Sequence, residues 1–218
     1  PEAQARDSTA CLPRLRFGLV VLVSLLLASC TREASDPDPT SPDPGYESFA
    51  VTDFALTDQN GEPADATILD GRYTVLDFFF TNCPIYCPAM SQVMLHVQRE
   101  TEGSGVRFLS ISVDGEHDTP EVIAAYAEEL GADPDRWRFL TGDPEHVRSI
   151  AEGQLYLGIT YDPTRPVTLG DGSSMDFIDH PTRLVLIGPD RRVLGTYSYA
   201  RKDEVDLLIE RIRRLHTP

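Results

Sequence analysis

Apolar and polar residues recur with two different periods along the chain, which predicts both strands and helices. Residues 74–80 form a short, almost continuously apolar run of β-forming side chains, the pattern of a strand buried on both faces. Residues 106–113 and 137–140 predict two further strands. Residues 182–187 and 192–197 flank a Gly-Pro-Asp turn and are typical of a hairpin.

Stretches with helical periodicity separate these strands. Residues 88–99 place apolar side chains on one face of a helix. Thr-Pro-Glu at 119–121 and Asp-Pro-Glu at 143–145 each supply an N-cap, a proline at the first helical position and an acid in the first turn. The first of these helices should run to Leu130, and residues 202–215 predict an amphipathic C-terminal helix.

This order of elements predicts an α/β sandwich, with a parallel part joined by crossovers and an antiparallel hairpin that completes the sheet. Residues 158–177 fit neither period and should form a long loop or a small hairpin. Loops of this length in compact domains are often functional.

The N-terminal residues 1–29 have the features of an export signal. Arg14 and Arg16 precede an apolar run of about twelve residues, shorter than the roughly 20 that a transmembrane helix needs. The sequence Leu-Ala-Ser-Cys at 27–30 resembles the lipobox of bacterial lipoproteins, which predicts cleavage before Cys30 and lipidation of that cysteine. Two alternatives remain: a retained membrane anchor, or ordinary cleavage with Cys30 as an incidental thiol.

Residues 30–48 are predicted to be a lipid-anchored tether. They are rich in Pro, Asp and Ser and contain almost no large apolar side chains, so they cannot build a core. One folded domain is expected over residues 49–218. The expected location is the extracytoplasmic, periplasmic face of a bacterial membrane.

The charge balance excludes one class of partner. The 218 residues carry a formal net charge of −16 at pH 7, which repels phosphate backbones and anionic lipid headgroups alike and argues against nucleic-acid binding. An acidic surface still offers electrostatic selectivity toward a protein partner.

The candidate chemistry lies in the segment Cys83-Pro84-Ile85-Tyr86-Cys87, between the first predicted strand and the first predicted helix. Ligands gather at such strand-to-helix junctions in parallel α/β sheets. A helix N-terminus lowers the pKa of a nearby thiol, so at least one of these cysteines is expected to have more thiolate character than usual. A thiolate is the form that binds metals and attacks disulfides.

Three residues separate the cysteines, whereas the redox motif of ordinary thioredoxins has two. Two thiolates are soft ligands that suit Cu(I) or zinc. A redox-active disulfide also remains open if the Cα atoms lie within about 4.4–6.8 Å of one another. A purely stabilising disulfide is a weaker alternative, because closing so small a loop gains little stability.

His180 is the candidate third ligand, since it directly precedes a predicted strand that would return it to the sheet edge holding the cysteines. His117, in an acidic loop, is a candidate ligand at a second site. Asp179 is a candidate hydrogen-bond acceptor for the His180 ring, as metal-bound histidines usually require.

Several motifs, in order along residues 49–215, resemble the Sco/SenC family of exported copper chaperones for cytochrome c oxidase assembly. The motifs are Asp-Phe-Ala-Leu-Thr-Asp-Gln-Asn-Gly at 53–61, Phe-Phe-Thr at 79–81, Cys-Pro-Ile-Tyr-Cys-Pro at 83–88, Ser-Ile-Ser-Val-Asp at 110–114, Asp-Thr-Pro at 118–120, Trp137, Leu-Thr-Gly at 140–142, Asp-His at 179–180 and Leu-Val-Leu-Ile-Gly-Pro-Asp at 184–190. The resemblance implies a thioredoxin-like three-layer sandwich with a central mixed β-sheet.

By the same resemblance, Cys83, Cys87 and His180 would bind one copper ion, as Cu(I) or Cu(II), and Cys83 and Cys87 would form the redox-active pair. The implied task is delivery of copper to the dinuclear copper centre of cytochrome c oxidase, or reduction of its cysteines. The implied partners are the copper-centre subunit of the oxidase and a periplasmic copper donor.

The sequence departs from the family pattern at Gly115, where proline is usual, and at Pro181, where a small hydroxyl residue is common. Pro181 restricts His180 to extended geometry, which bears on metal affinity more than on the fold. Two other functions stay open: an extracytoplasmic thiol-disulfide oxidoreductase, which needs only the cysteines, and a redox or copper sensor. Whether the protein is an enzyme depends on which of these applies.

Overall fold

The computed structural model describes residues 37–83, 86–169 and 172–216. The predicted signal segment 1–29, with Cys11, and the predicted lipidation site Cys30 lie outside the described residues and stay predictions. None of the helices in the described ranges is long and apolar enough to span a bilayer.

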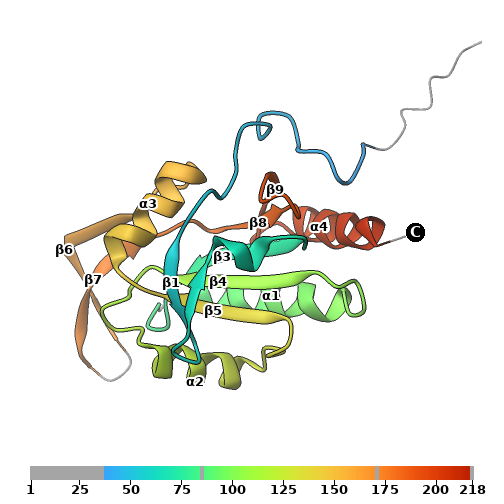
Figure 1. Cartoon of the computed structure of the whole chain (residues 1–218). Helices are drawn as coiled ribbons and strands as arrows, with labels where there is room; N and C mark the ends of the chain where they lie inside the picture. Colours follow the sequence, from blue (N-terminus) through green and yellow to red (C-terminus); the bar gives the residue numbers. More distant parts are fainter. Residues whose placement is uncertain (1–36, 84–85, 170–171, 217–218) are drawn as a thin grey trace, which may run out of the picture. The chain divides into compact units, whose positions relative to one another are not determined.

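A seven-stranded mixed sheet forms the centre of the fold, in the order β2-β1-β5-β4-β3-β8-β9 (Figure 1). Its strands are β1 (Ala55–Asp58), β2 (Pro63–Asp65), β3 (Thr74–Phe79), β4 (Arg107–Ser112), β5 (Trp137–Thr141), β8 (Arg183–Ile187) and β9 (Val193–Ser198). The three central strands β3, β4 and β5 run parallel, while β1, β2, β8 and β9 pair antiparallel. This confirms the predicted mixed sheet with a C-terminal hairpin.

Helices on both sides of the sheet complete three layers. They are α1 (Cys87–Glu100), α2 (Pro120–Leu130), α3 (Pro144–Gln154) and α4 (Lys202–Leu215), with a short 3-10 helix, η1, at Ala66–Leu69. Helix α1 packs against α2 and α4, whereas α3 lies on the other side of the central strands (Figure 1). The predicted caps form as expected, because Thr119 and Asp143 accept hydrogen bonds from backbone amides of the first turns of α2 and α3.

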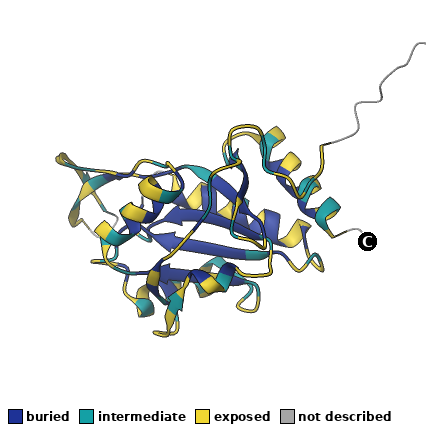
Figure 2. Ribbon diagram, turned by 45° about the horizontal axis from the view of Figure 1, so that its top comes forward, coloured by how far each residue is buried: buried dark blue, intermediate teal, exposed yellow. Residues whose placement is uncertain are grey.

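The core lies between these layers, and the strands of the central sheet are its most buried part (Figure 2). All six residues of β3 are buried, as the continuous apolar run predicts. Asp77 differs from its neighbours in this strand, because it is a buried acid among mostly apolar side chains.

A second, two-stranded sheet projects from the domain and is mostly exposed (Figures 1 and 2). It pairs β6 (Thr160–Thr168) with β7 (Ser174–Asp179) in antiparallel register. Of the two predictions for this region, the small hairpin is therefore confirmed over the long loop. The hairpin leads directly into His180 and so fixes where that residue enters the domain.

The N-terminal segment 37–48, which the sequence assigns to the tether, lies against β9 and α4. Arg211 in α4 donates hydrogen bonds to the carbonyls of Pro39 and Ser41 and to the Asp43 carboxylate. Gly195 in β9 leaves the space for Asp43, since a Cβ atom there would stand 2.2 Å from the Asp43 Oδ2 atom. These contacts place the segment in the same compact unit as the domain.

Candidate metal centre

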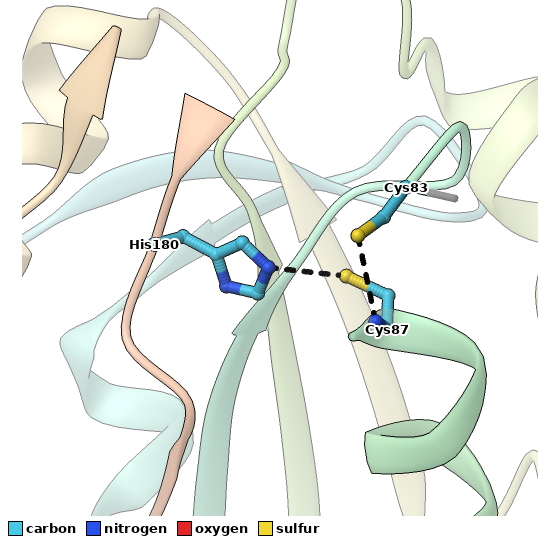
Figure 3. A group of neighbouring side chains, drawn as sticks. All are labelled: Cys83, Cys87 and His180. Carbon is cyan, nitrogen blue, oxygen red and sulfur yellow. Dashed lines mark hydrogen bonds between the residues drawn. The ribbon is translucent and has the colours of Figure 1, made fainter. Parts of the chain in front are cut away.

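Three side chains from different parts of the chain meet at the C-terminal end of β3. Cys83 lies in the loop that follows β3, Cys87 begins α1, and His180 stands between β7 and β8. The ligand atoms of the three residues all lie within 4.8 Å of one another (Figure 3). The geometry thus brings together the three residues that the sequence analysis named as metal ligands.

The start of α1 positions the two sulfurs relative to each other. Tyr86 occupies the N-cap position without a side-chain cap, so the first amides of the helix need other partners. The backbone N–H of Cys87 points at the Cys83 sulfur, with a distance of 3.4 Å between N and Sγ. A helix amide is therefore directed at a sulfur, as an anionic ligand would require.

The His180 ring is held with one nitrogen turned toward the sulfurs. Its Nδ1 atom lies 3.1 Å from the carbonyl oxygen of Pro181, and because a carbonyl only accepts, Nδ1 carries the proton. Nε2 then offers its lone pair and lies 3.2 Å from the Cys87 sulfur (Figure 3). The neutral tautomer with a free Nε2 is the form that ligates a metal.

The acceptor that orients His180 differs from the one the sequence suggested. Asp179 is exposed, and the Pro181 carbonyl takes the acceptor role instead. Successive residues of an extended chain point to opposite sides, so the carboxylate of Asp179 faces away when His180 faces inward. Pro181, a departure from the family pattern, thus supports the ring through its backbone oxygen.

Burial sets the protonation state of the site. Cys83, Cys87 and His180 are each at most 7% exposed, and the ring of Phe80 packs edge-on against the His180 ring. Burial raises the pKa of the Cys87 thiol above its ordinary value, and the neighbouring Cys83 raises it further. Loss of hydration thus outweighs the helix N-terminus at Cys87, and the prediction that at least one of the two thiols has more thiolate character than usual rests on Cys83.

A buried carboxylate holds the loop that carries Cys83. Asp118 accepts hydrogen bonds from the backbone N–H and the hydroxyl of Thr81, at 3.1 and 2.5 Å, and from the Ser112 hydroxyl at 2.5 Å. These bonds tie the end of β3 to the end of β4. In the sequence, Asp118 stands out only as part of a family motif. Its position just before the N-cap of α2 is the signal that could have shown its role.

Asp77 is a second buried acid near the site. Its Oδ1 atom accepts a hydrogen bond from Ser110 at 2.5 Å, while its Oδ2 atom has no partner among the described residues. Burial raises the pKa of Asp77 to about 6, and the Ser110 hydrogen bond opposes this rise.

The sulfurs border two hollows. Cys87 lines one of about 370 Å³ between α1 and α2, together with Thr81 and Tyr126. Cys83 borders a much smaller one under the β6–β7 hairpin, with Phe80 and Met175. Only the hollow at Cys87 is large enough to admit a group of a partner molecule.

His117 does not join a metal-ligating group among the described residues, which hold only the Cys83, Cys87 and His180 group. Its Nδ1 atom pairs with the Asp114 carboxylate at 2.8 Å, and this hydrogen bond raises the pKa of His117. The Nδ1 atom of His117 is thus engaged by a carboxylate, and no metal-ligating group among the described residues includes His117, so the suggested second site is not supported.

Comparison with known proteins gives a consistent result. The family model described as SCO1/SenC matches residues 43–217. The structure of a SCO1/SenC family lipoprotein from Bacillus anthracis str. Ames is similar, with 27% identity, a TM-score of 0.66, and coverage of 78% of this chain and 96% of that one.

Two further solved structures bear on chemistry. Bradyrhizobium japonicum ScoI with copper bound is 27% identical, with a TM-score of 0.59 and coverage of 75% of this chain and 99% of that one. BsSco, a member of the Sco family of cytochrome c oxidase assembly proteins in which a disulfide switch was identified, is 28% identical, with a TM-score of 0.65 and coverage of 80% and 96%.

Proposed function

This chain belongs to the SCO1/SenC family, and we propose that it is an exported, membrane-tethered copper chaperone. It would bind one copper ion as its cargo through Cys83, Cys87 and His180. It would then deliver the ion to the dinuclear copper centre of cytochrome c oxidase, or reduce the cysteines of that centre.

The observation that carries this proposal is the donor set of the buried group. Two sulfurs and one imidazole nitrogen within 4.8 Å of one another are soft and borderline ligands, which suit Cu(I) and also accept Cu(II). Carboxylates are absent from this group, which disfavours hard cations such as Mg²⁺ and Ca²⁺. The similar ScoI structure contains copper.

Each ligand has a defined part in loading and release. The raised pKa of Cys87 means that this thiol must lose its proton when the metal binds, so affinity should rise with pH. His180 would bind the metal through Nε2, because its Nδ1 atom is bonded to the carbonyl of Pro181. The ligand side chains are buried, and the hollow beside Cys87 is where a partner that offers its own soft ligands would take the metal.

The location and partners follow from the N-terminus and the relatives. A lipid on Cys30 would hold the domain at the extracytoplasmic face of the membrane, and a structurally similar family member is a lipoprotein. BsSco belongs to a family of cytochrome c oxidase assembly proteins, which supports the copper-centre subunit of the oxidase as recipient. A periplasmic donor would load the site.

Anaerobic copper stoichiometry with reduced cysteines tests the proposal. We expect one tightly bound copper in the parent and sharply weaker binding in His180→Ala and Cys83→Ser. His117→Ala is the matched control, since it removes a histidine outside the group and should leave binding unchanged. Unchanged binding in His180→Ala, or a parent without copper, would contradict the chaperone function.

A thiol-disulfide oxidoreductase or redox sensor is the second candidate, supported by the proximity of the two sulfurs and by the disulfide switch of BsSco. In that reaction two thiols lose two protons and two electrons to a partner disulfide, which becomes two thiols. His180→Ala separates the candidates, because it should impair copper binding and leave the dithiol reaction intact.

A further inference from the structure

A third hollow lies at the end of the central sheet opposite the metal centre. It has a volume of about 300 Å³, and four arginines line it: Arg72, Arg107, Arg136 and Arg138. Thr74 and Asp135 are also among its lining residues. We call it the arginine hollow. Four guanidinium groups around one hollow are unexpected in a chain whose net charge is −16.

Strand pairing brings these side chains to one face. Thr74 in β3 lies beside Arg107 in β4, and Leu109 in β4 lies beside Arg138 in β5. Side chains two residues apart in a strand share a face, so Thr74, Arg107 and Arg138 project from the same side of the sheet. Arg72 precedes β3 and Arg136 precedes β5, which places them at the same end.

Two of the four arginines are occupied with structural contacts. Arg136 donates to the backbone carbonyls of Gln98 and Thr101, and Arg138 forms an ion pair with Asp58. Arg72 and Arg107, by contrast, form no ion pair and no side-chain hydrogen bond within the described ranges. Their guanidinium groups therefore remain available to an external anion.

A buried hydroxyl supports the same conclusion. Thr74 is 2% exposed, and its Oγ1 atom has no hydrogen-bond partner among the described residues. A buried hydroxyl without a partner costs about 1–3 kcal/mol, so native proteins seldom keep one without a reason. An oxyanion in the arginine hollow would accept a hydrogen bond from this hydroxyl.

We propose that the arginine hollow binds a phosphate group. Guanidinium groups match the oxygens of phosphate with paired hydrogen bonds, and a threonine hydroxyl adds a neutral donor. The net negative charge of the chain does not prevent this, because at physiological salt charges more than about 8 Å away are largely screened. A hollow of this size suits a single phosphate group and not the extended backbone of a nucleic acid.

The position of the hollow suggests an anionic lipid headgroup as one source of this phosphate. β3 spans six residues, so about 17 Å of strand separate the hollow from the metal centre. The end of α4 lies at the hollow's end of the sheet, since His216 stands beside Gly105, just before β4.

The N-terminal segment reaches the same end of the molecule. Arg214 in the last turn of α4 donates a hydrogen bond to the carbonyl of Pro37. The seven residue steps from Cys30 to Pro37 span at most about 25 Å. This step rests on the proposed lipid anchor: a lipidated Cys30 would bring the arginine hollow toward the membrane and leave the metal centre facing away.

Isothermal titration calorimetry of the full chain in neutral detergent micelles tests the proposal, because it detects binding without a reporter side chain. We expect saturable binding of inorganic phosphate, with chloride at equal ionic strength as the reference. The double variant Arg72→Ala/Arg107→Ala should bind at least tenfold more weakly, and Thr74→Val more weakly by a smaller factor.

Arg99→Ala is the matched control, because Arg99 is an exposed arginine in the last turn of α1 that does not line the hollow. It should bind phosphate like the parent. Near-ultraviolet circular dichroism establishes that each variant is folded. Copper stoichiometry should be unchanged in all of them, so failure of this proposal is distinguishable from failure of the chaperone function.

A vesicle arm identifies the source of the phosphate. The full chain is reconstituted into phosphatidylcholine vesicles with and without phosphatidylglycerol, and the heat of phosphate binding is compared, because a bound anionic headgroup would compete with phosphate for the hollow. Weaker phosphate binding in the vesicles with the anionic lipid assigns a lipid headgroup, whereas equal phosphate binding in both kinds of vesicle assigns a free phosphate compound. The absence of saturable phosphate binding in both arms, or equal binding in the double variant, would overturn the proposal.

Discussion

The two ends of the central sheet are built from the same strands but present different chemical groups. At the C-terminal end of β3, buried sulfur and nitrogen atoms converge, whereas at its N-terminal end four arginines surround a hollow. The first environment favours a soft metal ion through its sulfur and imidazole ligands, and the second favours a hard oxyanion by presenting fixed positive charge. Strand direction thus separates two incompatible electrostatic environments within one small domain.

Each end also contains a buried oxygen without a partner among the described residues. Near the metal centre it is Oδ2 of Asp77, and in the arginine hollow it is Oγ1 of Thr74. A buried oxygen without a hydrogen-bond partner lowers the stability of the fold at both places, which is typical of sites shaped for a ligand or a reaction. The following predictions test whether the two ends are independent.

The largest effect is expected from Cys87→Ser. An alcohol replaces a thiolate ligand, so copper affinity should fall on the order of a thousandfold, or about 4 kcal/mol. Competition with a chelator of known affinity measures this loss. Phosphate binding at the arginine hollow should not change, and a parallel loss there would show that the two ends are coupled.

Asp118→Ala should have the next largest effect, a loss of about 3 kcal/mol in the free energy of unfolding. The substitution leaves the Thr81 amide and the Thr81 and Ser112 hydroxyls without their buried acceptor. Urea denaturation measures the loss. Copper affinity should fall as well, because the loop before Cys83 loses its attachment; full affinity in a folded variant would contradict this positioning role.

Asp77→Asn tests the buried acid by its pH dependence. The folded pKa of about 6 lies above the ordinary value of 3.8, so the folded state holds a proton that the unfolded state has lost. Stability of the parent should therefore fall as pH rises from about 4 to about 6 and then level off. The variant lacks this penalty, and its free energy of unfolding should exceed that of the parent by up to about 3 kcal/mol at pH 8.

At pH 4 the Asp77→Asn variant and the parent should be nearly equal in stability. Chemical denaturation at both pH values, on the metal-free protein, measures the difference. A gain that is the same at both pH values would show that packing, and not ionisation, is responsible.

Thr74→Val should have the smallest effect, a gain of about 1 kcal/mol in the absence of phosphate. The change removes a buried hydroxyl without a partner and keeps the shape of the side chain. Thermal unfolding measures it. Added phosphate should make the parent more stable than the variant, because only the parent keeps the hydroxyl that donates to the anion.

Much of the fold was predictable because its elements carry strong local signals. The apolar run of β3 and the cap-proline-acid sequences before α2 and α3 determine these elements with little help from the rest of the chain. β1, β2 and η1 were not predicted as elements. They are only three or four residues long, and the β1–β2 turn depends on the Asp58 carboxylate, which accepts from the amides of Asn60 and Glu62.

The sequence alone determined the types and order of the metal-ligand residues and their place at strand ends. Spacing marks Cys83 and Cys87 as a pair, and the motif before β8 marks His180. Only the tertiary structure decided the rest. Burial, which no local pattern encodes, raises the Cys87 pKa against the helix dipole, and the backbone path makes Pro181 the acceptor for His180. The arginine hollow likewise exists only in the folded chain. Its four arginines are spread over 67 positions, and the pairing of β3, β4 and β5 brings together the strand ends that carry them.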